Sequence, residues 1–160
     1  MTAGISRISL GSEMEQQRRI NANDPANSAF VIFALAAGHE SLATLRTYAD
    51  LATLLAGTGN DEPTNANYAR VVVTDAGLGD PTVSGSNMVA TITDITPALT
   101  AVAAGNNWSV VGIGYDSDTT GGTDSGIVMT YLCELTSDFV PNGSDVNYDF
   151  PTALFTASPV

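Results

Sequence analysis

The chain has 160 residues, of which 17 are acidic and only five are basic, and its formal net charge is −12. Phosphate neutralisation requires lysine and arginine, so this balance argues against a nucleic-acid-binding protein. The single cysteine excludes a disulfide framework within the chain, and with a single histidine it also excludes a Cys/His-rich zinc site.

The composition is that of a folded domain, since 44% of the residues are hydrophobic and 14% are charged. The longest apolar run, at residues 29–37, is much shorter than the roughly 20 residues that a membrane-spanning helix requires. Residues 1–19 lack the basic-then-apolar layout of a secretory signal. We therefore expect a soluble protein that does not interact with membranes.

Charge is distributed unevenly along the chain. Through Arg46 there are four acidic residues and four arginines, whereas from Thr47 onward there are thirteen acidic residues and one arginine, Arg70. The net charge is therefore carried by the second segment. This division suggests a charge-balanced N-terminal part and an acidic body.

Residues 1–28 contain few apolar side chains, and these are scattered. One interpretation is a frayed tail. The other is an extended N-terminal arm that becomes ordered on a neighbouring subunit, preceding a single β-rich domain at residues 29–160. The arm would use apolar anchors and arginines, and the contact residues expected are Ile5, Arg7, Ile8, Leu10, Arg18 and Arg19.

The elements expected after the arm are mostly strands. Residues 30–35 are predicted to form a buried strand, and residues 41–56 the one helix, with Ser41 as N-cap and Gly57 as its stop. Further strands are predicted at residues 68–74, 88–93, 108–115, 127–135 and 145–150, with a last one at 153–156. The fold class is mainly β with one helix (α+β), arranged as an antiparallel β-sandwich or an open barrel.

The loop after the 108–115 strand is the strongest candidate for a metal site. Asp116, Asp118 and Asp124 could supply oxygen ligands to Ca²⁺ on a Gly-rich turn. The alternative is a polar hairpin loop, because the acidic residue that would close an EF-hand-like loop is replaced by Ile127. No cofactor is expected.

Two residues with reactive side chains are better explained by structural roles. His39 lies just before the helix with no cysteine or second histidine nearby in the sequence, which favours a loop residue over a catalytic one. Cys133 lies within a strand and has no basic neighbour, which favours a buried apolar side chain over a reactive thiolate. No catalytic residue is predicted, and the protein is expected not to be an enzyme.

Several short motifs follow one another from the helix to the end of the chain. They are Ala-Thr-Leu-Arg-x-Tyr at residues 43–48, Asn-Tyr-Ala-Arg at 67–70, Val-Val-Gly-Ile-Gly-Tyr-Asp at 110–116 and Pro-Asn-Gly-Ser-Asp at 141–145. Over residues 29–156 this pattern resembles a family of tailed-phage virion structural proteins. These are capsid decoration or head-associated β-sandwich proteins that contain the Asn-Tyr-Ala-Arg motif.

The resemblance implies a structural virion component with a β-sandwich-like body and no catalytic residues. Together with the division of charge and the lack of a catalytic motif, it leads us to expect a bacteriophage capsid decoration (cement) protein that stabilises the shell. We expect it to bind the major capsid protein on the outer head surface of the virion, after assembly in the host cytoplasm, and to form a homo-oligomer, most simply a homotrimer. One alternative is a tail, fibre or head-to-tail adaptor component. The other is a carbohydrate- or receptor-binding module, which would need Trp108, Tyr115 and Tyr131 as an exposed aromatic platform.

Overall fold

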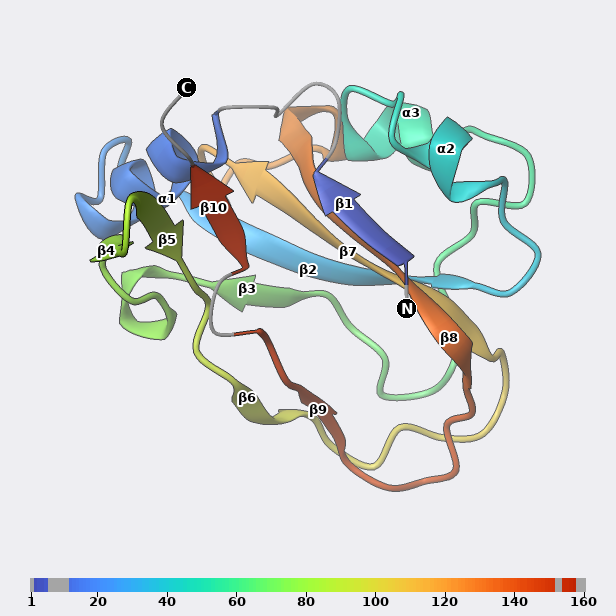
Figure 1. The fold of residues 1–160 in the computed structure, drawn as a ribbon. Helices are drawn as coiled ribbons and strands as arrows, with labels where there is room; N and C mark the ends of the chain where they lie inside the picture. The colour runs from blue at the N-terminus through green and yellow to red at the C-terminus, as the bar shows by residue number, and fades with distance from the viewer. Residues whose placement is uncertain (1, 6–11, 152–153, 158–160) are drawn as a thin grey trace.

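The computed structural model describes residues 2–5, 12–151 and 154–157. At its centre is a five-stranded antiparallel sheet with the strand order β1-β8-β7-β2-β3 (Figure 1). The strands of this sheet are β1 (Thr2–Ile5), β2 (Ala29–Ala36), β3 (Val71–Val73), β7 (Trp108–Asp116) and β8 (Ile127–Phe139). The two long strands β7 and β8 and the buried strand β2 confirm the strands predicted at residues 108–115, 127–135 and 30–35.

Strand β2 is buried along its whole length because both faces of the sheet are covered. Phe30, Ile32 and Ala34 belong to the core on one face, whereas Val31 and Phe33 belong to the core on the other. A continuous apolar run is the pattern expected of such a strand, since its side chains alternate between two buried faces.

Two short helices cover one face of the sheet. They are α2 (Leu42–Leu45) and α3 (Leu51–Leu55), and their leucines pack into the core on that face. The single helix predicted over residues 41–56 is wrong in this respect, because the chain is extended at Asp50 and starts a second helix there. The Asp50 carboxylate accepts a hydrogen bond from the Thr53 amide at 2.8 Å, and this cap competes with helix continuation.

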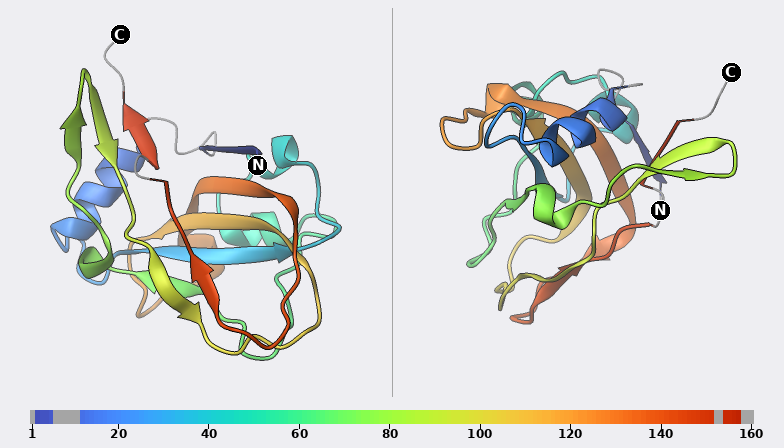
Figure 2. Two further views of the ribbon diagram at one scale, coloured as in Figure 1. Left: turned by 60° about the horizontal axis from the view of Figure 1, so that its bottom comes forward. Right: turned by 90° about the vertical axis from the view of Figure 1, so that its left-hand side faces the viewer.

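The opposite face is covered by two smaller sheets and a helix (Figure 2). The three-stranded sheet has the order β10-β5-β4, and the two-stranded sheet pairs β6 with β9. These elements are α1 (Glu13–Asn21), β4 (Thr82–Ser84), β5 (Asn87–Ala90), β6 (Ile95–Leu99), β9 (Val146–Tyr148) and β10 (Phe155–Ala157). The result is a mainly β, sandwich-like α+β fold, as the sequence predicted. Within the described ranges no helix is long and apolar enough to cross a membrane.

The predicted extended arm over residues 1–28 is corrected where the structure describes it. Strand β1 pairs antiparallel with β8 of the same chain, and residues 13–21 form the helix α1. Ile20 of this helix is buried in the core. The buried face of α1 has helical spacing, but three of its four residues are polar (Glu13, Gln16, Gln17, Ile20), so hydrophobic periodicity could not reveal it.

Candidate functional site

An apolar groove lies on the face of the central sheet that carries the smaller sheets. It has a volume of about 460 Å³ and lies between β7 and β8 on one side and residues 145–151, which include β9, on the other. This size lies within the range of about 300–1,000 Å³ that ligand sites occupy. Aromatic side chains form much of its wall, and they are Trp108, Tyr131, Phe139, Tyr148 and Phe150.

The lining of the groove includes two acidic residues, Asp145 and Asp149, and two polar groups that are uncharged at neutral pH. The Tyr148 hydroxyl is buried without a hydrogen-bond partner, and burial raises the pKa of Tyr148 to about 12. Burial also raises the pKa of the Cys133 thiol, which keeps it protonated. The groove is therefore suited to binding apolar groups rather than to nucleophilic chemistry.

The three rings proposed for carbohydrate binding do not form an exposed platform. Trp108 is 1% exposed and Tyr115 is 8% exposed, while Tyr131 is half-buried in the groove wall. The Trp108 indole nitrogen donates to the side-chain oxygen of Asn65 at 3.2 Å, which anchors the ring inside the fold. The burial of Trp108 and Tyr115 leaves only Tyr131 of the three rings open to solvent, so the three do not offer a shared stacking surface for a sugar.

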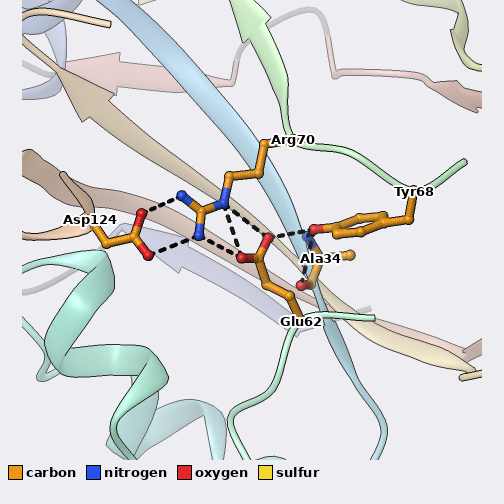
Figure 3. A network of polar contacts seen from close by, with 5 residues as sticks. All are labelled: Ala34, Glu62, Tyr68, Arg70 and Asp124. Atoms are coloured by element: carbon orange, nitrogen blue, oxygen red, sulfur yellow. Dashed lines mark hydrogen bonds and ion pairs between the residues drawn. The ribbon is translucent and has the colours of Figure 1, made fainter. Parts of the chain in front are cut away.

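A polar network centred on Arg70 lies beside β2 (Figure 3). The guanidinium contacts the Glu62 carboxylate, with 2.6 Å between Nη2 and Oε2, and also pairs with Asp124, with 3.0 Å between Nη2 and Oδ2. The Tyr68 hydroxyl donates to Glu62 Oε1 at 2.7 Å and accepts from the Ala34 amide of β2 at 3.0 Å.

This network joins three segments that are far apart in the sequence: β2, the loop at Glu62 and the loop at Asp124. The hydrogen bonds from Arg70 hold the pKa of Asp124 below its usual range, and the two carboxylates raise the pKa of Arg70. Tyr68 and Arg70 belong to the Asn-Tyr-Ala-Arg motif. The motif therefore serves to hold the fold together.

The three acidic residues proposed to bind Ca²⁺ do not converge. Asp116 accepts from the Asp118 amide at 3.0 Å, Asp118 accepts from the Thr120 amide at 3.1 Å, and Asp124 pairs with Arg70. The hydrogen bonds from Thr120 lower the pKa of Asp118. In the part of the chain that the structure describes, no group of three Asp, Glu, His or Cys side chains is placed to hold a metal ion.

His39 and its neighbour Glu40 lie in a polar loop next to α2. The His39 Nδ1 atom lies 2.6 Å from the Glu40 carbonyl oxygen. The Glu40 carboxylate has two other partners, accepting from the Tyr48 hydroxyl at 2.7 Å and from the Asn60 amide group at 2.8 Å. The Glu40 carboxylate is thus used to hold the loop.

The predicted contact residues of the N-terminal segment are only partly described. Arg7, Ile8 and Leu10 lie outside the described residues, and Ile5 is in β1, where its backbone is opposite Tyr131. The Arg18 and Arg19 side chains lie on the exposed side of α1, where both contact Glu15, at 2.7 and 3.0 Å. These two hydrogen-bonded arginines lower the pKa of Glu15 to about 2.

The strand predicted at residues 88–93 corresponds to β5, whereas its partner β4 and the projecting hairpin that the two strands form were not predicted (Figure 2). Val83 of β4 is opposite Met88 of β5, and their exposed fractions are 73% and 41%. No residue between Asp80 and Asp94 is ionisable, but residues 95–114 carry no charge either, so the charge pattern does not single out the hairpin. An uncharged hairpin that exposes two adjacent apolar side chains on an acidic protein is a candidate interaction surface.

No protein-family model, curated protein or solved structure matches this chain.

Proposed function

We propose that this chain is a non-enzymatic structural protein of a tailed-phage virion. In this proposal it is a decoration protein that binds the major capsid protein on the outer head surface and associates with copies of itself as a homotrimer. Linking neighbouring capsid subunits would oppose the outward pressure of the packaged DNA. The protein would need no cofactor and would bind neither nucleic acid nor membrane.

The observation that supports this proposal most directly is what the resemblance motifs do in the fold. Tyr68 and Arg70 of Asn-Tyr-Ala-Arg hold β2 to two loops, and Tyr48 of the helix motif holds Glu40. None of these side chains lines the groove, whereas Val111, Ile113 and Asp145 of the other two motifs do. The internal contacts of Tyr48, Tyr68 and Arg70 support a structural role for their two motifs.

Arg18 and Arg19 are the described residues that could contact acidic groups on the shell. Both guanidinium groups are exposed on α1, and both are held near Glu15. Deleting the N-terminal segment would not test this contact cleanly, because Ile20 of α1 belongs to the core. Point substitutions on the exposed side of α1 are the better perturbation.

The test measures binding of the purified protein to expanded capsids. The double variant Arg18→Gln with Arg19→Gln removes two positive charges and is expected to bind more weakly, with a smaller dependence on salt. The matched control changes the net charge equally at distant exposed sites, Thr58→Glu with Asn142→Asp, and should bind as the unmodified protein does. Unmodified protein that fails to bind expanded capsids would refute the proposal.

The number of copies per virion separates head decoration from the tail, fibre or adaptor alternative. Decoration requires copies in proportion to the capsid subunits, whereas a tail or adaptor component is present in a few copies. Quantitative mass spectrometry of purified virions against the major capsid protein gives this ratio directly. A ratio of only a few copies would exclude a decoration role.

A further inference from the structure

Exposed apolar side chains are concentrated on two features of the molecule. The structure describes five exposed large hydrophobic residues, and four of them lie either on the β4–β5 hairpin or at the end of β8 beside the groove. Val83 and Met88 are on the hairpin; Phe139 lines the groove, and Val140 follows it. One feature projects and the other is hollow.

The hairpin has the properties of an insert. Val83 and Met88 are directly opposite in the β4–β5 register, so their side chains lie on the same face of the ribbon. The hairpin stands away from the central sheet (Figure 2) and is not folded over the groove of its own chain, since Val83 is 73% exposed. We call the pair Val83 and Met88 the hairpin patch.

The groove has the properties of the complementary receptor. Its wall is mostly apolar, and its volume of about 460 Å³ is large enough for side chains such as valine and methionine. The charged residues that line it, Asp145 and Asp149, are both acidic. An acidic insert would be repelled there, whereas the segment between Asp80 and Asp94 brings no charge.

The net charge of the chain limits which part of a second copy can occupy the groove. Two copies that each carry a formal charge of −12 repel one another over most of their surfaces. Contact between copies is favoured where one partner is uncharged and both are apolar. The hairpin patch and the groove are such a pair, and both are present on every copy.

We infer that the hairpin patch of one copy inserts into the groove of the next copy. Val83 and Met88 become buried against the aromatic wall near Phe139. Because the two surfaces differ, the contact is head-to-tail, and it closes into a ring when the rotation between neighbours divides the full turn. This contact would be the one that joins the copies of the proposed homotrimer, and the number of copies rests on the proposed function. The contact itself can be tested on the purified protein alone.

The first experiment measures the oligomeric state by sedimentation velocity over a range of concentrations. The unmodified protein should associate, and Val83→Asp should weaken association by on the order of tenfold or more, because it inserts a charge into an apolar, acidic groove. The matched control is Val72→Asp, which changes another exposed valine in a three-residue strand, on β3. It should associate as the unmodified protein does, and thermal unfolding checks that both variants are folded.

The groove contains two native probes, because Trp108 and Cys133 are the only tryptophan and the only cysteine of the chain. Tryptophan emission should change with concentration in the unmodified protein and not in Val83→Asp. Val83→Cys should form disulfides with Cys133 of the next copy on mild oxidation and give covalent rings. In the double variant Val83→Cys with Cys133→Ser, a disulfide can form only between the hairpins of two copies. This variant can give covalent dimers, and covalent rings should disappear.

Unmodified protein that stays monomeric at all concentrations would overturn the inference, and so would Val83→Asp that assembles normally. An exogenous apolar compound that quenches Trp108 equally in monomeric unmodified protein and in Val83→Asp would identify a ligand pocket instead. Binding to expanded capsids is measured in a separate experiment. A protein that assembles through the hairpin but does not bind capsids refutes the proposed function and leaves this interface intact.

Discussion

The Tyr68 hydroxyl takes the place of a missing strand partner on β2. Strand β3 pairs with β2 only as far as Ile32, which is opposite Val71. The next position on that side, Ala34, is fully buried, and its amide donates to the Tyr68 hydroxyl at 3.0 Å. Tyr68→Phe removes this acceptor and also the donor that faces Glu62.

The expected cost follows from the groups that are left without partners. A buried amide without an acceptor costs roughly 1–3 kcal/mol, and a hydrogen bond to a charged group contributes about 1.5–3 kcal/mol. Glu62 keeps its contacts with Arg70, which reduces the second contribution. We expect Tyr68→Phe to lower the free energy of unfolding by about 2–4 kcal/mol, which lowers Tm by roughly 5–15 °C in a chain of this length.

Tyr148→Phe is the matched control, since it removes the same hydroxyl from a buried ring of the core against which the partly buried Tyr68 packs. The Tyr148 hydroxyl has no hydrogen-bond partner, so its loss should change stability by less than about 0.5 kcal/mol or should stabilise the protein. Urea and thermal unfolding, followed by circular dichroism, measure both variants. If Tyr68→Phe and Tyr148→Phe unfold at the same midpoint, the strand-completing role of Tyr68 is wrong.

Two further predictions concern the Arg70 network and the packing of the central sheet. Because Arg70 lowers the pKa of Asp124, the pair stabilises the fold above the unfolded-state pKa of about 3.9 and ceases to do so as the pH falls through the lower folded-state value. Asp124→Asn should therefore be less stable than the unmodified protein at pH 7, and urea midpoints should converge at lower pH; a gap that is constant with pH would contradict this. A Cβ at Gly112 would lie 2.2 Å from a Phe33 ring carbon, so Gly112→Ala should cost about 1–3 kcal/mol. Gly126→Ala, with no atom within 4 Å of its Cβ, should be close to neutral, and equal unfolding midpoints for the two alanine variants would refute the packing argument.

The sequence alone was sufficient for the elements whose signal is local. Strand β2 is a short run of apolar, aromatic and β-branched residues. Strands β7 and β8 are also rich in such residues and lie between Gly- and Asp-rich turns. The mainly β class follows from several such runs. Ser41 was also identified correctly as a cap, because its side chain accepts from the Thr44 amide.

The errors lie where local signals compete or are polar. Asp50 and Thr53 form a capping box inside an apolar periodicity that otherwise reads as one helix. Helix α1 buries Gln16 and Gln17 through hydrogen bonds to distant groups, such as the one from Gln17 to the Thr91 carbonyl oxygen at 3.2 Å. Such bonds are not visible in a hydrophobic pattern.

The candidate sites depend almost wholly on contacts between residues distant in sequence. The sequence grouped Asp124 with Asp116 and Asp118 as a candidate metal site because the three are close in the chain. In the fold, Asp124 instead pairs with Arg70, 54 positions away. The groove likewise joins β7 and β8 to the strand β9, and no local pattern encodes that proximity. Periodicity and turn residues determine which segments are strands, because those preferences act over a few residues. Only the tertiary structure decides which side chains meet, because that depends on how the strands are ordered and packed.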